Sequence, residues 1–145
     1  MARASPRTLN LDPNRRAIEQ SWTLVGARRG RIWYARRVYH HRGSVTSVRF
    51  DGLAVLRREE VRGDVLGFFH THPDGPPRPS ARDVRTMRAW CSSFGKPLLC
   101  VIASPEGLAG FRFDGGEGKS SGGLPLATIE VFPRGVVIGV EADGG

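Results

Sequence analysis

At residues 65–83 the chain reads VLGFFHTHPDGPPRPSARD, and this stretch decides most of what the sequence predicts about the fold. The near-continuous apolar run over 65–69 is typical of a central strand covered on both faces, and a histidine follows it. Four prolines within 71–79 exclude a helix and a regular strand ladder in that segment. A helix is predicted to begin at Ser80. The stretch therefore predicts a buried strand, a stiff loop and a helix in succession.

The segments on both sides of this stretch predict a mixed α/β domain. The helix from Ser80 ends at Gly95 and carries an apolar stripe formed by Val84, Met87, Cys91 and Phe94. Further helices are predicted over about 12–19, which opens with Asp12-Pro13, and over 52–61 behind Asp51. Strands are predicted over 21–27, 31–40, 45–50, 98–103, 108–113, 126–132 and 136–140. We therefore expect a single mixed sheet flanked by helices on its faces.

The length of 145 residues suits one domain over 1–145, with a loose basic arm over 1–10 and a flexible glycine-rich loop over 115–123. No run of about 18 apolar residues is present, and the N-terminal segment lacks the apolar run of a secretory signal. We therefore expect no membrane partner and a cytoplasmic location. Cys91 and Cys100 match no metal or redox motif, so they are predicted to be core residues in a reducing compartment.

The net charge of +8 results from 22 basic against 14 acidic residues. Such a balance suits nucleic acid, an anionic membrane or an acidic protein partner. Arginine supplies 20 of the 22 basic residues, a bias that a GC-rich genome explains equally well. No stacking platform or recognition-helix pattern accompanies the charge, and this disfavours nucleic acid as a partner.

A His-x-His pair stands at the end of the predicted central strand. Side chains two residues apart on a strand point to the same side, so His70 and His72 can reach one metal ion. Pro73 keeps His72 in extended geometry. Asp83 falls in the first turn of the next helix and can add a carboxylate oxygen. Two nitrogens and one oxygen leave a fourth position for water, which is the plan of a catalytic zinc site.

Each half of this pattern also has a structural interpretation. A His-x-His pair is often structural, and Ser80 with Asp83 is by itself a helix capping box. Their combination, with ten residues between His72 and Asp83, is much more specific for a metal site. A nucleobase deaminase is excluded because it requires His-x-Glu followed by Pro-Cys-x-x-Cys.

These residues resemble the motif of the JAB/JAMM (MPN-plus) zinc metalloprotease family, in its minimal prokaryotic type. The motif comprises His70-x-His72-Pro73, the interval of ten residues to Asp83, and Ser80 three residues before Asp83. The predicted order of elements also fits, so the resemblance covers nearly the whole chain. It implies the JAB/MPN, cytidine-deaminase-like α/β architecture.

The family also has an upstream glutamate, and the segment Glu19-x-x-x-x-Leu24-x-Gly26 resembles that region. One departure is Trp22, which stands where the family often has a small residue, so Trp22 must be accommodated near the site. Two rival glutamates, Glu59 and Glu60, lie about ten residues before the first histidine, in a predicted surface helix.

The resemblance implies a role for each matching residue. His70, His72 and Asp83 would bind zinc. Glu19 would act as general base and later protonate the leaving amine, and Ser80 would donate to the oxyanion. The implied reaction is hydrolysis of the isopeptide or peptide bond after the tail of ubiquitin or a ubiquitin-like protein, without a covalent intermediate. The implied partners are that protein, its conjugates and the E1- and E2-like proteins of a prokaryotic conjugation or antiphage pathway.

Three other functions are considered. A peptidase that releases a small adduct from a sulfur-carrier ubiquitin-like protein uses the same site. A nucleic-acid-binding, DNA-repair-associated module of the same fold is favoured by the charge and by arginine pairs at 28–29, 36–37 and 57–58. A metal-free scaffold is disfavoured because a scaffold does not need Glu19, His70, His72, Ser80 and Asp83 together.

Overall fold

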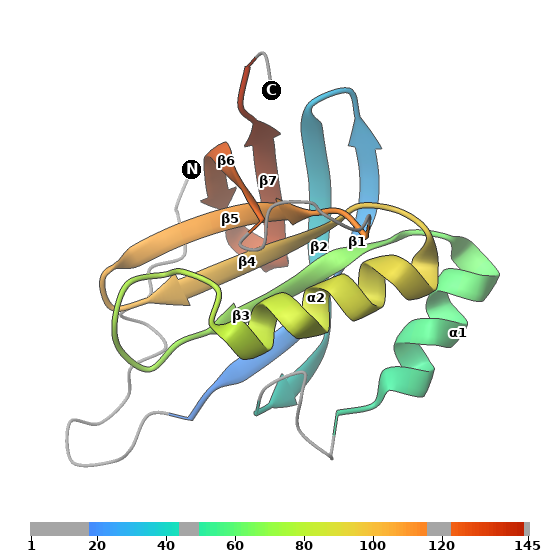
Figure 1. The fold of residues 1–145 in the computed structure, drawn as a ribbon, viewed down its shortest axis with the longest axis horizontal. Coiled ribbons are helices and arrows are strands. Elements are labelled where there is room, and N and C mark those ends of the chain that lie inside the picture. The colour runs from blue at the N-terminus through green and yellow to red at the C-terminus, as the bar shows by residue number, and fades with distance from the viewer. Residues whose placement is uncertain (1–17, 44–49, 116–122, 144–145) are drawn as a thin grey trace.

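A computed structural model describes residues 18–43, 50–115 and 123–143, and their seven strands form one closed barrel (Figure 1). The strands follow one another around the barrel in the order β1-β2-β7-β6-β5-β4-β3. Neighbouring strands are antiparallel except for β3 and β4, which are parallel. The strands are β1 (Gln20–Arg29), β2 (Ile32–Arg42), β3 (Val65–Thr71), β4 (Leu98–Ser104), β5 (Gly107–Phe113), β6 (Leu124–Val131) and β7 (Val136–Glu141).

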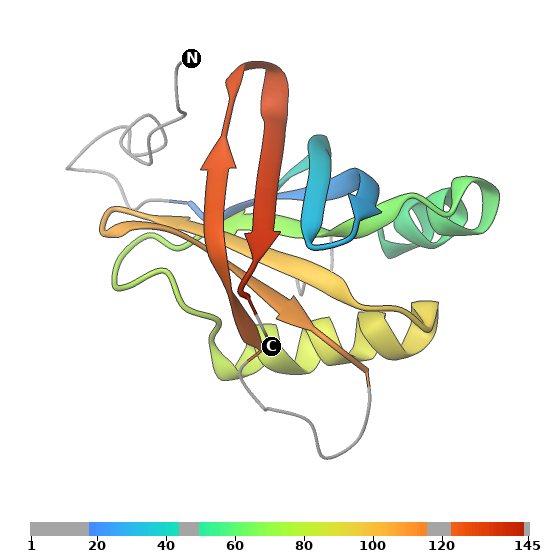
Figure 2. The ribbon, with the colours of Figure 1, turned by 90° about the horizontal axis from the view of Figure 1, so that it is seen from above.

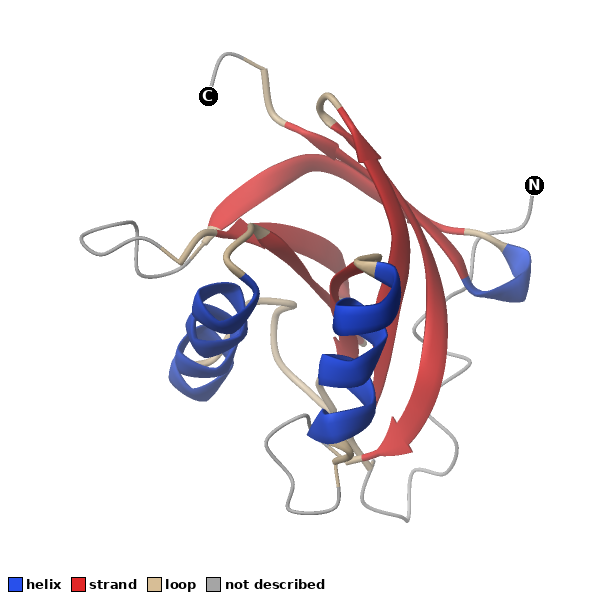
Figure 3. Cartoon of the chain, turned by 90° about the vertical axis from the view of Figure 1, so that its right-hand side faces the viewer, coloured by secondary structure: helices blue, strands red, loops and turns tan. Residues whose placement is uncertain are grey.

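The predicted sheet with helices on its faces is wrong. The sheet closes because β2 pairs with β7, which sets Ile32 opposite Val140 and Arg36 opposite Val136. The described residues contain two α-helices, α1 (Gly52–Arg62) and α2 (Ala81–Phe94), and a short 3₁₀ turn at Pro133–Gly135. Both α-helices lie outside the barrel (Figure 3). The inner face of the sheet is therefore buried by its own closure and not by helices.

Two apolar cores lie on the two sides of the barrel wall, and β4 contributes to both. Its residues alternate strictly, because successive side chains on a strand point to opposite faces. Leu99, Val101 and Ala103 join the inner core with Leu24, Trp33, Ala35, Leu66, Phe69, Val131 and Val137. Leu98, Cys100 and Ile102 join the outer core with Val55, Val65, Phe68, Met87, Cys91 and Phe113. Both helices thus pack on the outer side of β3, β4 and β5.

The hairpin of β6 and β7 crosses β4 and β5 steeply (Figure 2). Its hydrogen-bonded contact with β5 is short and involves the pairs Phe111–Pro125 and Arg112–Leu124. Farther along, Leu126 closes the barrel by packing against the backbone of Gly110, which has no Cβ there. No helix in the described ranges is both long enough and apolar enough to cross a membrane.

The helix ends follow the sequence signals. Asp51 caps α1 by accepting from the Ala54 N–H at 3.1 Å, and Gly63 ends it in the left-handed conformation. Gly95 ends α2 in the same way. The predicted helices over 52–61 and 80–94 and the strands within the described ranges are confirmed. Four predicted segments lie entirely or mostly outside the described residues: the arm over 1–10, the helix over 12–19, the strand over 45–50 and the loop over 115–123. Of the predicted helix, Ile18 and Glu19 are described, and they are not helical.

The parallel contact between β3 and β4 depends on Gly67. Its φ of 149° is unfavourable for other residues, and a Cβ placed there would lie 2.0 Å from the Leu99 carbonyl oxygen. Backbone atoms cannot move away without breaking the ladder, so no side chain fits at this position.

We therefore predict that Gly67→Ala lowers the free energy of unfolding by about 3 kcal/mol, because it overpacks a buried strand contact. Gly30→Ala is the matched control, since Gly30 also has a positive φ (60°) but no atom lies within 4 Å of the added methyl group. That control should cost only about 1 kcal/mol. Urea unfolding of both variants measures the difference, and equal losses would contradict the role given to Gly67.

Candidate metal centre

The antiparallel register of β1 and β3 brings the upstream glutamate to the histidines. Ser21 lies opposite His70, so one step of two residues along each strand places Glu19 opposite His72. Because side chains alternate, all four lie on the outer face of the barrel. Beyond the last ladder pair, the Gln20 N–H donates to Thr71 Oγ1 at 2.8 Å and keeps the strands together.

Two further backbone hydrogen bonds hold the ends of these strands. The His72 N–H donates to the Ala103 carbonyl at 2.9 Å, which extends the contact of β3 with β4 past the end of the strand. The Gly43 N–H donates to the Glu19 carbonyl, which ties that residue to the end of β2. Glu19 and His72 are therefore positioned by neighbours on both sides.

Asp83 reaches the same place from the first turn of α2. Ser80 caps this helix: its Oγ accepts from the Asp83 N–H at 3.1 Å, while Asp83 Oδ2 accepts from the Ser80 N–H at 2.9 Å. The Asp83 carboxylate is thus fixed by the capping box, and the N-terminal end of the helix dipole favours its charge. The residue is only 8% exposed.

The three donor atoms form a nearly equilateral triangle. His70 Nε2 lies 3.1 Å from His72 Nε2 and 3.2 Å from Asp83 Oδ2, and His72 Nε2 lies 3.1 Å from the same oxygen. Donors at ordinary zinc distances in a tetrahedral site lie about 3.3 Å from one another. One carboxylate oxygen and two ring nitrogens facing a common point are therefore suited to hold one metal ion.

The same arrangement shifts the protonation equilibria of the metal-free site. Burial raises the pKa of Asp83, but hydrogen bonds from His70 and His72 outweigh it, and the pKa lies well below its usual range. The hydrogen bond with Asp83 raises the pKa of His72 against the opposing effect of burial. Asp83 is therefore an anion at neutral pH, the form that binds a metal.

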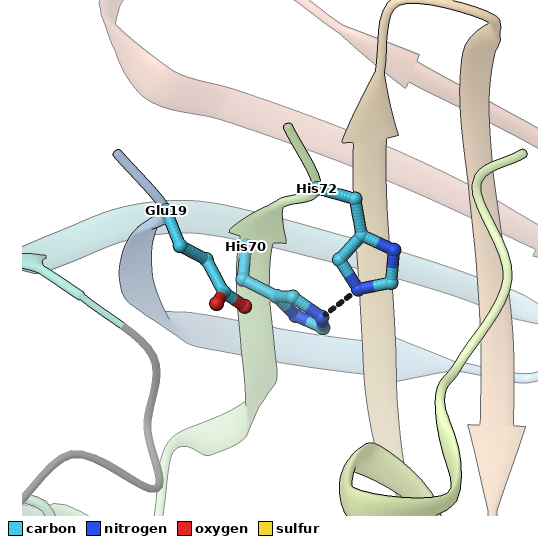
Figure 4. Close-up of side chains that lie close together, drawn as sticks. All are labelled: Glu19, His70 and His72. Atoms are coloured by element: carbon cyan, nitrogen blue, oxygen red, sulfur yellow. Dashed lines mark hydrogen bonds between the residues drawn. The ribbon is translucent and has the colours of Figure 1, made fainter. Parts of the chain in front are cut away.

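Glu19 approaches the histidines from the opposite side to α2 (Figure 4). A Glu19 carboxylate oxygen and the two histidine donor atoms lie within 4.8 Å of one another. Of the rival glutamates, Glu59 is engaged elsewhere: it accepts from the Val65 N–H at 3.1 Å and pairs with Lys96 at 2.8 Å. Glu60 is exposed on α1. The structure thus brings together Glu19, His70, His72 and Asp83, with Ser80 holding Asp83.

Trp22 does not crowd this site, contrary to the expectation from sequence. It belongs to the inner face of the barrel, where it stacks on His40 with ring centroids 4.6 Å apart. The predicted core cysteines are confirmed: both are buried and free, and burial raises the pKa of Cys91 to about 11. Sequence reasoning missed Thr71, whose hydroxyl joins β1 to β3; the residue between two metal-site histidines carries no signal of its own.

Comparison with known protein families shows to which family the chain belongs. The model of the prokaryotic homologues of the JAB domain matches residues 13–114. The chain belongs to the prokaryotic JAB family. The predicted resemblance is therefore confirmed at the level of the family. The matched range of this JAB domain includes β1 and β3, the start of α2, and all five residues of the site.

One curated relative is similar to a short part of this JAB domain. It is the histone H2A deubiquitinase MYSM1 of Branchiostoma floridae, which is 36% identical over 44 residues. The match spans 28% of this chain and 5% of that much longer protein.

If the donor triangle holds a metal, replacing one donor must weaken binding. We predict that wild-type protein retains about one zinc ion per chain after dialysis and that His72→Ala weakens binding by at least about 100-fold, since loss of mere supporting contacts already costs 10–100-fold. His40→Ala is the control, because His40 bonds to Gln20 on the inner face. Elemental analysis and competition with a chelator measure both. Equal zinc content in wild type and His72→Ala would contradict the site.

Proposed function

We propose that this JAB domain is a zinc-dependent peptidase that cleaves the peptide or isopeptide bond after the C-terminal tail of a ubiquitin-like protein. The observation that carries the proposal is the donor triangle of His70, His72 and Asp83 with the Glu19 carboxylate beside it. Membership of the JAB family and the short match to a deubiquitinase support the same reaction class.

His70, His72 and Asp83 would hold the zinc ion. When bound, zinc supplies Lewis-acid chemistry: it polarises a carbonyl group and lowers the pKa of a water molecule to about 7. This set of two imidazoles and one carboxylate matches the ligand types of catalytic zinc sites, which keep a further position open. The protein therefore contributes a rigid, partly buried set of donors at the end of a strand.

Glu19 would move the protons of the reaction. Its carboxylate accepts a proton from the water that attacks the carbonyl carbon, and it returns a proton to the leaving nitrogen as the C–N bond breaks. No covalent bond to the protein forms. The proximity of a Glu19 carboxylate oxygen to ligand atoms of both histidines, all within 4.8 Å of one another, supports this role.

Ser80 would stabilise the oxyanion. Its Oγ accepts the Asp83 N–H, so its own O–H proton remains available to donate, and the residue is exposed. Capping and oxyanion stabilisation are thus compatible, because one uses a lone pair of the hydroxyl and the other its proton.

The substrate tail would bind in extended form beside a strand edge, where backbone hydrogen bonds supply affinity. We propose that the protein acts in a reducing compartment, the cytoplasm, a proposal that the free state of Cys91 and Cys100 supports. The partners proposed are a ubiquitin-like protein, its conjugates and the E1- and E2-like proteins of the same pathway.

Cleavage of a ubiquitin-like fusion tests the function directly. We predict that Glu19→Gln retains zinc but loses at least about 100-fold in kcat, because the amide cannot accept the proton. Glu60→Gln, an exposed glutamate on α1, is the matched control and should retain full activity. A parallel assay with a tail that carries only a single amino acid distinguishes release of a small adduct. Full activity of Glu19→Gln would contradict the assignment of the base.

A second variant separates the two roles of Ser80. Ser80→Ala removes both the cap and the hydroxyl proton, so we predict a loss of about 1 kcal/mol in stability and of about 10²–10³-fold in kcat, with zinc retained. Ser80→Asp keeps a capping oxygen without a proton to donate, and it should regain stability but not activity. Recovery of activity in Ser80→Asp would show that Ser80 acts through the helix alone.

A further inference from the structure

At one end of the barrel, the described residues place no carboxylate beside the guanidinium group of Arg37. Arg37 points into the barrel, since it pairs with inward-facing Leu24 and lies over the rings of Trp22 and Phe69 at 4.7 and 4.9 Å. Its Nε atom is sealed from solvent and has no hydrogen-bond partner. Among residues 18–43, 50–115 and 123–143, no carboxylate comes within ion-pair distance of Arg37.

At the other end of the barrel, a second arginine–tryptophan pair has a carboxylate partner. There Arg28 lies over the ring of Trp33 at 4.9 Å, an arrangement like that of Arg37 on Trp22. Glu141 neutralises it: its carboxylate lies 2.8 Å from Arg28 and accepts from Trp33 Nε1 at 2.7 Å and from Arg112 at 3.0 Å. Two arginine–tryptophan pairs thus line one barrel, and only one of them has an acid in the described chain.

The side chains around Arg37 are mainly aromatic rings. His40 stacks on Trp22 and forms a hydrogen bond with Gln20 at 2.8 Å. Gly135, in the 3₁₀ turn, lies close to the backbone and Cβ of Arg37. Burial lowers the pKa of Arg37, because desolvation disfavours the charged form of its guanidinium group. An anion bound to the guanidinium group would stabilise its charged form and accept hydrogen bonds from its N–H groups.

We propose that Arg37, with Trp22, His40 and Phe69 around it, forms a binding site for an oxyanion, a carboxylate or a phosphate group. The Arg37 site lies on the inner side of the β1–β3 rim, and the metal donors lie on its outer side. A carboxylate could come from an acidic peptide and a phosphate from solution, and the two sources bind through the same guanidinium chemistry.

The site is tested by titrating the 145-residue chain with anions while following the three tryptophan indole N–H resonances by NMR. The probes are inorganic phosphate, and acetyl-aspartate amide against acetyl-asparagine amide, at constant ionic strength. We expect a saturable shift of the Trp22 resonance with at least one anion and none with the asparagine compound. The anion that saturates at the lower concentration identifies the source. A Trp22 resonance unmoved by both anions would overturn the proposal.

The matched variants are Arg37→Gln and Arg36→Gln, since Arg36 is the exposed neighbour on the same strand. We expect the dissociation constant to rise at least about tenfold in the first and to stay unchanged in the second. Equal responses of the two variants would overturn the site. Unchanged Trp33 and Trp90 resonances report that Arg37→Gln is folded. If it is not, Arg37→Lys decides: a raised dissociation constant supports the site, and an unchanged one overturns the assignment to Arg37.

Discussion

The antiparallel register of β1 against β3 is the constraint on which the candidate site depends. With Ser21 opposite His70, the strand period of two places Glu19 and both histidines on one face. A slip of one residue would turn Glu19 to the inner face of the barrel, away from the histidines. The register is held by buried pairs on both sides of the wall, with Leu24 and Phe69 inside and Phe68 outside. The packing that stabilises the barrel is thus the packing that aligns the proposed chemistry.

The helix α2 adds the third donor through a local interaction that also defines its own start. A capping box stabilises a helix by about 1 kcal/mol. Here its acidic residue, Asp83, also faces two imidazole rings. Asp83 can serve both purposes because one oxygen accepts the Ser80 N–H and still faces the ring nitrogens. The prolines of the loop over 73–79 limit the ways in which the chain can lead from β3 to α2. Together these features make a preorganised site from two elements that are adjacent in sequence.

The sequence predicted local structure and the composition of the site better than it predicted the architecture. The run over 65–69, the cap at Asp51 and the glycine at 95 each specify one element through short-range physics, and those elements are confirmed. The predicted helix-flanked sheet is wrong because barrel closure depends on the pairing of β2 with β7, about 100 residues apart, which no periodicity reveals. The geometry around Glu19 was accessible only through a family resemblance, since a single glutamate gives no local signal. In the sequence Arg37 stands out only as half of the arginine pair at 36–37, because an inward-facing arginine looks like any other in an arginine-rich strand.

If the proposed function is right, two imidazoles and one carboxylate of this chain hold zinc at a site open to water. X-ray absorption at the zinc edge, on protein loaded with one equivalent of zinc, tests it most directly. We expect a shell of nitrogen and oxygen at about 2.0–2.1 Å, with outer-shell scattering from two imidazole rings and no sulfur. Sulfur scattering at about 2.3 Å, or the signature of fewer than two imidazoles, would contradict it.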